Sequence, residues 1–155
     1  MMRTIHLVSQ AVMVTFALLV MLGSPATAQT GLIDVNMASE AQLAQQPHMT
    51  PAIAKDLVAH RPFKTVVDFN KFLLDQKLTQ AQATELYRKA FVKINLNTGT
   101  KDEFMLIPGV GARMSAEFAE YRPWKSWAQF DKEIGKYVGQ QETDRFKQYV
   151  LIPGI

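Results

Sequence analysis

The chain has 155 residues, of which 48% are hydrophobic and 20% are charged, proportions that are ordinary for one or two small globular domains. It contains no cysteine, which excludes disulfides and thiol chemistry, and its formal net charge is only +3. Without Arg3, 16 basic side chains face 14 acidic ones. This near balance excludes the strongly basic composition that is typical of tight nucleic-acid binders.

The first 28 residues have the pattern of a signal peptide. Arg3 precedes an apolar run at residues 11–22, which Gly23, Ser24 and Pro25 interrupt. Ala26-Thr27-Ala28 then supplies the small-x-small pattern of a cleavage site. We therefore expect cleavage near Ala28-Gln29 and a periplasmic or secreted protein. The alternative is an N-terminal membrane anchor, which the short apolar run disfavours because a spanning helix needs about 20 apolar residues.

An internal repeat organises the rest of the chain. After a short segment at residues 29–32, residues 33–69 match residues 94–130 without a gap, at an offset of 61. The match continues beyond residue 130 after one deletion. The sequence therefore predicts two tandem units of about 60 residues each: unit 1, residues 33–92, and unit 2, residues 93–155.

Unit 1 is predicted to contain four short helices. Each begins at a hydroxyl side chain or a proline, which are typical of helix N-termini. The helices are expected to begin near Ser39, Pro51, Thr65 and Thr79. Pro62 ends the second of them, because the residue before a proline is pushed out of the α region. The fourth is expected to run to about Phe91, and residues 33–35 to form an extended lead-in.

Unit 2 repeats this pattern, so the predicted fold class is all-α, with two antiparallel helical hairpins in each unit. Its first three helices are expected to begin near Thr100, Ala112 and Ser126. The second hairpin has a short connection, Tyr137-Val138-Gly139-Gln140. The closing residues 151–155 have no following helix and are expected to form a tail.

The first hairpin of unit 2 turns at Pro108-Gly109-Val110-Gly111, followed by Ala112 and Arg113. Glycine tolerates φ > 0 and lets a neighbouring backbone approach closely, and Val110 is expected to turn inward. Gly111 opens a helix whose first N–H groups have no internal partner and carry the positive end of the helix dipole. Such an end binds anions, above all phosphate, and Arg113 would flank the same phosphate.

The first hairpin of unit 1 lacks these features. Its turn is Pro47-His48-Met49-Thr50, followed by Pro51-Ala52, so both glycines and the arginine are absent. Thr50 is expected to cap the next helix and to occupy an N–H group that an anion would need. Unit 1 is therefore predicted to be structural or to bind a partner.

Unit 2 resembles the helix-hairpin-helix domain of the ComEA family, the exported DNA receptors of competence. The resemblance rests on three motifs: Asn95-Leu96-Asn97-Thr98, Ile107-Pro108-Gly109-Val110-Gly111, and Tyr121-Arg122-Pro123-Trp124-Lys125-Ser126. It implies two tandem helix-hairpin-helix domains, the first degenerate, and contact with double-stranded DNA without sequence preference. The expected contact residues are Pro108, Gly109, Val110, Gly111, Ala112, Arg113, Lys125 and Gly139. The resemblance also allows a monovalent cation at the Gly109–Gly111 turn.

Other functions are weighed against this one. The acidic pairs Asp102-Glu103 and Glu117…Glu120 lie in a helix cap and on a helix surface, and no nucleophile and base come together, so no catalytic site, enzyme activity or small-molecule substrate is expected. His48 and His60 lack further ligands nearby, so no metal site or other cofactor is expected. The alternative function is a periplasmic structural or protein–protein interaction module with periplasmic or membrane-protein partners, which the low net charge favours.

Overall fold

The computed structural model describes residues 31–155. The expected signal peptide and its cleavage site lie outside the described residues. Within residues 31–155, no helix is both long enough and apolar enough to cross a membrane.

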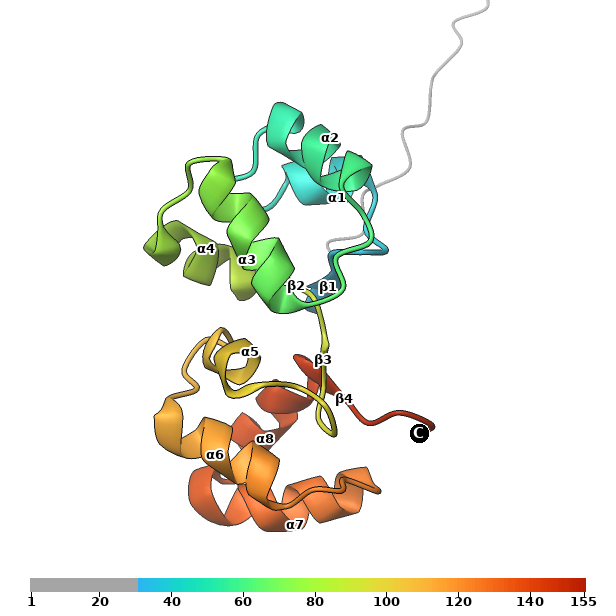
Figure 1. Ribbon diagram of the computed structural model, residues 1–155, viewed down its shortest axis with the longest axis vertical. Coiled ribbons are helices and arrows are strands. Elements are labelled where there is room, and N and C mark those ends of the chain that lie inside the picture. Colours follow the sequence, from blue (N-terminus) through green and yellow to red (C-terminus); the bar gives the residue numbers. More distant parts are fainter. Residues whose placement is uncertain (1–30) are drawn as a thin grey trace, which may run out of the picture.

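The chain forms the same series of elements twice, and the two units are stacked along the long axis of the molecule (Figure 1). Unit 1 contains β1 (Ile33–Asp34), α1 (Glu40–Ala44), α2 (Pro51–Ala59), α3 (Val66–Asp75), α4 (Gln80–Tyr87) and β2 (Ala90–Phe91). Unit 2 contains β3 (Ile94–Asn95), α5 (Lys101–Met105), α6 (Ala112–Glu120), α7 (Trp127–Val138), α8 (Gln140–Lys147) and β4 (Val150–Leu151). The predicted all-α class is confirmed, since the strands have only two residues each.

Side-chain caps start the helices where the sequence predicts them. The hydroxyls of Ser39, Thr65, Thr79 and Thr100 each accept from the backbone N–H three residues later, in four capping boxes. Ser126 caps α7 in the same way, accepting from the N–H of Gln129 at 3.1 Å. These bonds satisfy N–H groups that the helices themselves leave without partners, and each is worth about 1 kcal/mol.

Two predictions about the ends of the units are wrong. Helix α4 ends at Tyr87 instead of near Phe91, because Ala90–Phe91 leaves the helix to pair with β1 as a parallel strand. The chain end is likewise no free tail, since Val150–Leu151 pairs in parallel with β3 and Ile152 is buried. Each pairing joins the first and last segments of a unit, too far apart in sequence for a local pattern to show.

A repeated asparagine fixes the lead-in strand of each unit to the loop after its second helix. The side chain of Asn36 accepts from the N–H of Phe63 at 2.8 Å and donates to its carbonyl at 2.9 Å. Asn97 does the same for Trp124, at 2.6 and 3.0 Å. The amide thus substitutes for a strand partner, which gives this asparagine a structural reason in both units.

The two units share one hydrophobic core. At their boundary the rings of Phe91 and Tyr149 meet edge to face, with centroids 5.0 Å apart. Both residues are buried, and each follows the last helix of its unit. Helices α3 and α5 also contact each other at this boundary, where Figure 1 shows α5 below α3.

Candidate nucleic-acid interface

The turn between α5 and α6 is tight and apolar on its inner side. Pro108 and Val110 are buried, and the N–H of Val110 donates to the carbonyl of Ile107 at 2.9 Å. Gly109 has φ +86°, a left-handed conformation that side chains rarely adopt. The backbone conformation therefore explains the first glycine of the turn.

Arg145 in α8 holds this turn from outside. Its Nη2 donates to the Pro108 carbonyl at 2.7 Å, and its Nε donates to Glu142 at 2.8 Å. A Cβ added at Gly109 would lie 3.2 Å from the same Nη2. A monovalent cation fits this turn poorly, because the Arg145 guanidinium already binds the Pro108 carbonyl and the Ile107 carbonyl is used within the turn.

Gly111 has neither a conformational nor a packing reason to be glycine. Its φ of −101° and ψ of −179° are extended values that any residue adopts, and a Cβ there would meet nothing within 4 Å. As the N-cap of α6 it supplies no side-chain hydrogen bond. The first N–H groups of α6 therefore point outward beside an open surface, with the positive end of the helix dipole.

A shallow pocket of about 250 Å³ lies at this helix end, lined by Gly111, Arg113, Met114 and Tyr137. Arg113 is exposed, and its guanidinium carbon lies 5.6 Å from the centroid of the Tyr137 ring. Among the described residues Arg113 makes no ion pair. Tyr137 was not expected at this site from the sequence, because it lies 24 positions after Arg113. The corresponding end of α3 in unit 1 has Gln76 and Lys77 and no aromatic residue, which was the available signal.

Tyr137 belongs to a hydrogen-bonded group that links α6 to α7. Its hydroxyl lies 3.0 Å from that of Tyr121, which also accepts from the Lys136 amine at 2.8 Å. Hydrogen bonds with Tyr121 and then Glu117 raise the pKa of Tyr137 to about 12, so it is a neutral phenol at physiological pH. The Glu117 carboxylate, which interacts with the Tyr137 hydroxyl, adds a negative charge near the pocket and opposes an anion there.

The structure does not bring all the predicted DNA-contact residues together at the start of α6. Lys125 is exposed and follows the C-terminal end of α6, whose nine residues span about 14 Å from the Gly111 end. Gly139 is the whole connection between α7 and α8, with φ +77°, and it caps α8 without a side chain. It comes two residues after Tyr137, within about 7 Å of chain.

The corresponding turn of unit 1 is closed, in the sense that side chains of the protein itself occupy the turn and the start of the helix that follows it. His48 takes the place of Gly109 and has φ +61°. Its Nε2 lies 2.6 Å from a carboxylate oxygen of Glu85, the residue that corresponds to Arg145 of unit 2. The Thr50 hydroxyl accepts from the N–H of Ile53 at 3.2 Å, as predicted. The N-terminus of α2 therefore lacks the open, uncapped surface that Gly111 leaves on α6.

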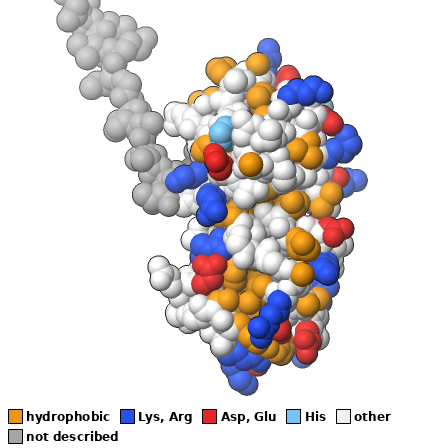
Figure 2. Space-filling view, turned by 90° about the vertical axis from the view of Figure 1, so that its left-hand side faces the viewer, with side chains coloured by type: hydrophobic (Ala, Val, Ile, Leu, Met, Phe, Trp, Pro, Cys, Tyr) orange, Lys and Arg blue, Asp and Glu red, His pale blue; other side chains and the backbone are white. Residues whose placement is uncertain are grey.

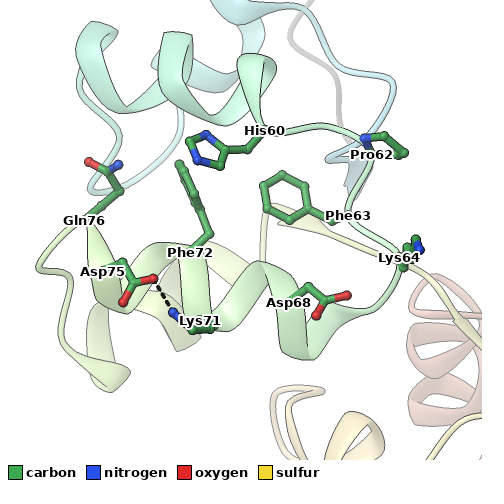
Figure 3. A pocket seen from close by; sticks show the side chains of 9 residues that line it. All are labelled: His60, Pro62, Phe63, Lys64, Asp68, Lys71, Phe72, Asp75 and Gln76. Atoms are coloured by element: carbon green, nitrogen blue, oxygen red, sulfur yellow. Dashed lines mark hydrogen bonds and ion pairs between the residues drawn. The ribbon is translucent and has the colours of Figure 1, made fainter.

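Unit 1 has a different cavity, of about 390 Å³, between α3 and the loop that follows α2 (Figure 3). His60 and Phe63 from the loop side face Phe72 of α3, and charged side chains of both signs surround these rings. In unit 2 the residues at the positions of His60 and Phe63 are Tyr121 and Trp124, and Lys136 lies across the Tyr121 ring at 4.5 Å. Unit 2 therefore has larger aromatic side chains in this region, and a lysine lies directly over one of them.

Charge is dispersed over the described surface. On the face in Figure 2, basic side chains are scattered over both units with acidic and hydrophobic ones between them. Most basic side chains of unit 2 already have partners within the protein: Lys136 forms an ion pair with Glu133, and Lys147 forms one with Asp131. Arg122 donates to the Leu96 carbonyl at 2.7 Å and to that of Gly99. Within residues 31–155 no group of three or more His, Asp or Glu side chains could hold a metal ion.

Comparison with known protein families finds one match. Residues 28–85 match the family model described as the helix-hairpin-helix motif. This range covers unit 1 into α4 and stops before the turn at Gly109, so unit 2 is related to the motif through the internal repeat. The comparisons with curated proteins and with solved structures found no match. The chain thus carries a helix-hairpin-helix motif, one that commonly binds nucleic acids.

Proposed function

We propose that this chain is an exported, ComEA-like protein that binds the backbone of double-stranded DNA without reading its sequence. The contact is made by unit 2, where the first N–H groups of α6 and the Arg113 guanidinium together hold a phosphate. Contacts of this kind address the phosphate backbone and carry no base information. The biological role that the resemblance suggests is DNA uptake in the periplasm during competence.

The observation that carries this proposal is the glycine at position 111. Neither its backbone angles nor its surroundings call for glycine, whereas the turn glycine at 109 is explained by its positive φ. A bare N-cap leaves the α6 N–H groups open to a ligand, which Thr50 prevents on α2. Phosphate is the anion that such helix ends commonly bind.

Binding should be weak because few charges take part. The residues that follow the expected signal peptide carry about two more basic than acidic side chains, and most cations of unit 2 have partners within the protein. The attraction therefore depends on one helix end and one arginine, and the affinity should decrease with salt along a shallow slope, because only about one phosphate is neutralised.

The test is fluorescence anisotropy of the mature protein with a labelled duplex, over a salt series. The logarithm of the affinity should fall with the logarithm of the salt concentration, with a slope of about −0.9 for each phosphate neutralised. Arg113→Ala should weaken binding about tenfold, as expected for one lost charge-assisted hydrogen bond, and lower the slope by about one phosphate. Gly111→Val should weaken it as well, because its side chain covers the helix end.

Two controls separate local placement from net charge. Lys101→Ala removes the same charge from the exposed start of α5 and should change the affinity little. His48→Ala alters the closed turn of unit 1 and should also have little effect. Absence of binding at low salt, or equal losses in the Arg113 and Lys101 variants, would contradict the proposal.

A second candidate function is a periplasmic protein–protein interaction module. The cavity beside Phe63 and Phe72 in unit 1 favours it, because it combines an apolar floor with charged side chains of both signs in the unit whose turn is closed (Figure 3). Lys71→Ala changes an exposed side chain at this cavity without touching the core, so it would impair this function and leave the DNA affinity of unit 2 nearly unchanged, which the same anisotropy assay measures.

A further inference from the structure

The Arg113 side chain has an aromatic support at the end of α6. Its guanidinium carbon lies 5.6 Å from the centroid of the Tyr137 ring, within the range of cation–π attraction. An exposed arginine on a helix surface samples many rotamers, and immobilising it on binding costs conformational entropy. A ring that already holds the guanidinium beside the pocket reduces that cost.

Tyr137 is itself fixed from two directions. Its hydroxyl is hydrogen-bonded to Tyr121, which caps the C-terminal end of α6, and the Lys136 amine lies 5.2 Å from the Tyr137 ring centroid. Lys136 in turn is held by Glu133 at 2.8 Å. The ring that supports Arg113 is therefore tied to both α6 and α7 and keeps its place beside the pocket.

We propose that Tyr137 is a positioning residue for nucleic-acid phosphate, holding the Arg113 guanidinium beside the bare N-terminus of α6. The ligand class is a phosphodiester, which would receive hydrogen bonds from the helix N–H groups on one side and from Arg113 on the other. This inference rests on the proposed function. It adds a residue that neither the turn motif nor the helix end identifies.

The comparison between the two units supports this assignment. Unit 1 has Thr50 in place of Gly111 and Ala52 in place of Arg113, and it has Gln76 and Lys77 but no aromatic residue where unit 2 has Tyr137. The uncapped helix end, the cation and the supporting ring are thus all absent from the same unit. The hydrogen-bond partner of Tyr137, Tyr121, is also replaced in unit 1, by His60, so a double-mutant cycle is needed to separate positioning of Arg113 from packing.

The test is a double-mutant cycle between Arg113→Ala and Tyr137→Leu, with the anisotropy of a labelled duplex as the readout. Leucine keeps an apolar side chain at a half-exposed helix position but removes the ring. Tyr137→Leu should weaken binding about three- to fivefold in the presence of Arg113, the equivalent of one exposed cation–π contact. In the Arg113→Ala background it should cause no further loss.

Tyr137→Phe is the matched control. It keeps the ring and removes the hydroxyl bond that helps to fix it, so it should retain more affinity than Tyr137→Leu, and any loss should again disappear in the Arg113→Ala background, while the thermal midpoint reports the lost hydrogen bond. Two results would overturn the inference: wild-type affinity in Tyr137→Leu, or losses that multiply in the double variant. Loss of DNA binding by the unmodified chain itself would instead overturn the proposed function.

Discussion

Two glycines two residues apart have opposite physical reasons. Gly109 is required by its left-handed φ and by the approach of Arg145, whereas Gly111 is required by neither strain nor packing. The same substitution at both positions therefore separates the stability of the turn from its binding function. This distinction is not visible in the letters of the motif, where both glycines look alike.

Gly109→Ala should lower the free energy of unfolding by about 1–2 kcal/mol, the cost of placing a Cβ at positive φ. Gly111→Ala should change it by less than about 0.5 kcal/mol, because the reduced entropy of the unfolded chain and the weaker N-cap preference of alanine oppose each other. Urea unfolding followed by circular dichroism measures both. Equal losses in the two variants would show that the second glycine also serves the fold.

At the scale of elements, α8 carries two internal ion pairs and one that joins it to α7. Glu142 pairs with Arg145, and Asp144 pairs with Lys147, which also bonds Asp131 of α7 at 2.5 Å. Hydrogen bonds from Arg145 and Lys147 hold the pKa values of Glu142 and Asp144 below their ordinary range. The stability of α8 and of its contact with α7 therefore depends in part on ionised carboxylates.

These lowered pKa values predict an acid-sensitive unit 2. A carboxylate whose pKa is lower in the folded than in the unfolded state contributes its full stability above the unfolded pKa of about 4, and this contribution is lost as the pH falls through the folded value. The thermal midpoint should thus stay nearly constant from pH 7 to 5 and drop below about pH 4. Glu142→Gln should lower the thermal midpoint at pH 7 and reduce its fall below pH 4. If the midpoint of the variant falls with pH as much as that of the unmodified chain, the acid sensitivity does not come from Glu142.

Helix starts could be predicted from the sequence because they depend on local chemistry. Ser39, Thr65, Thr79 and Thr100 cap the helices they were expected to cap. The β1–β2 and β3–β4 pairs could not be predicted, since their partners lie more than 50 positions apart and each strand has two residues. The pocket beside Arg113 has the same character, because Tyr137 reaches it only through the packing of α7 on α6.

At the scale of the whole molecule, the contact of Phe91 with Tyr149 couples the two units. Phe91 belongs to unit 1, whereas both tryptophans of the chain, Trp124 and Trp127, belong to unit 2. Tryptophan fluorescence therefore reports the unfolding of unit 2 alone, and far-UV circular dichroism reports both units. In the unmodified chain the two signals should show one coincident transition, as a shared core requires.

Phe91→Ala should separate these transitions. Truncation of a buried phenylalanine costs about 3–5 kcal/mol of stability. At position 91 it weakens both the packing of unit 1 and the contact between the two units. The circular dichroism signal should begin to change at lower denaturant than the fluorescence. Leu57→Ala in α2 destabilises unit 1 away from the boundary and should keep the signals coincident. Coincident transitions in the Phe91 variant would show that other contacts suffice.

The parallel strand pairs have a consequence for how such chains can grow. Because β1 pairs with β2 and β3 pairs with β4, the first and last residues of each unit lie side by side. Only Val92 and Lys93 separate β2 from β3. A duplicated or transplanted unit can therefore be joined in series by two residues without stretching its neighbours. The architecture is suited to evolution by duplication, after which one copy can lose its glycines while the other keeps them.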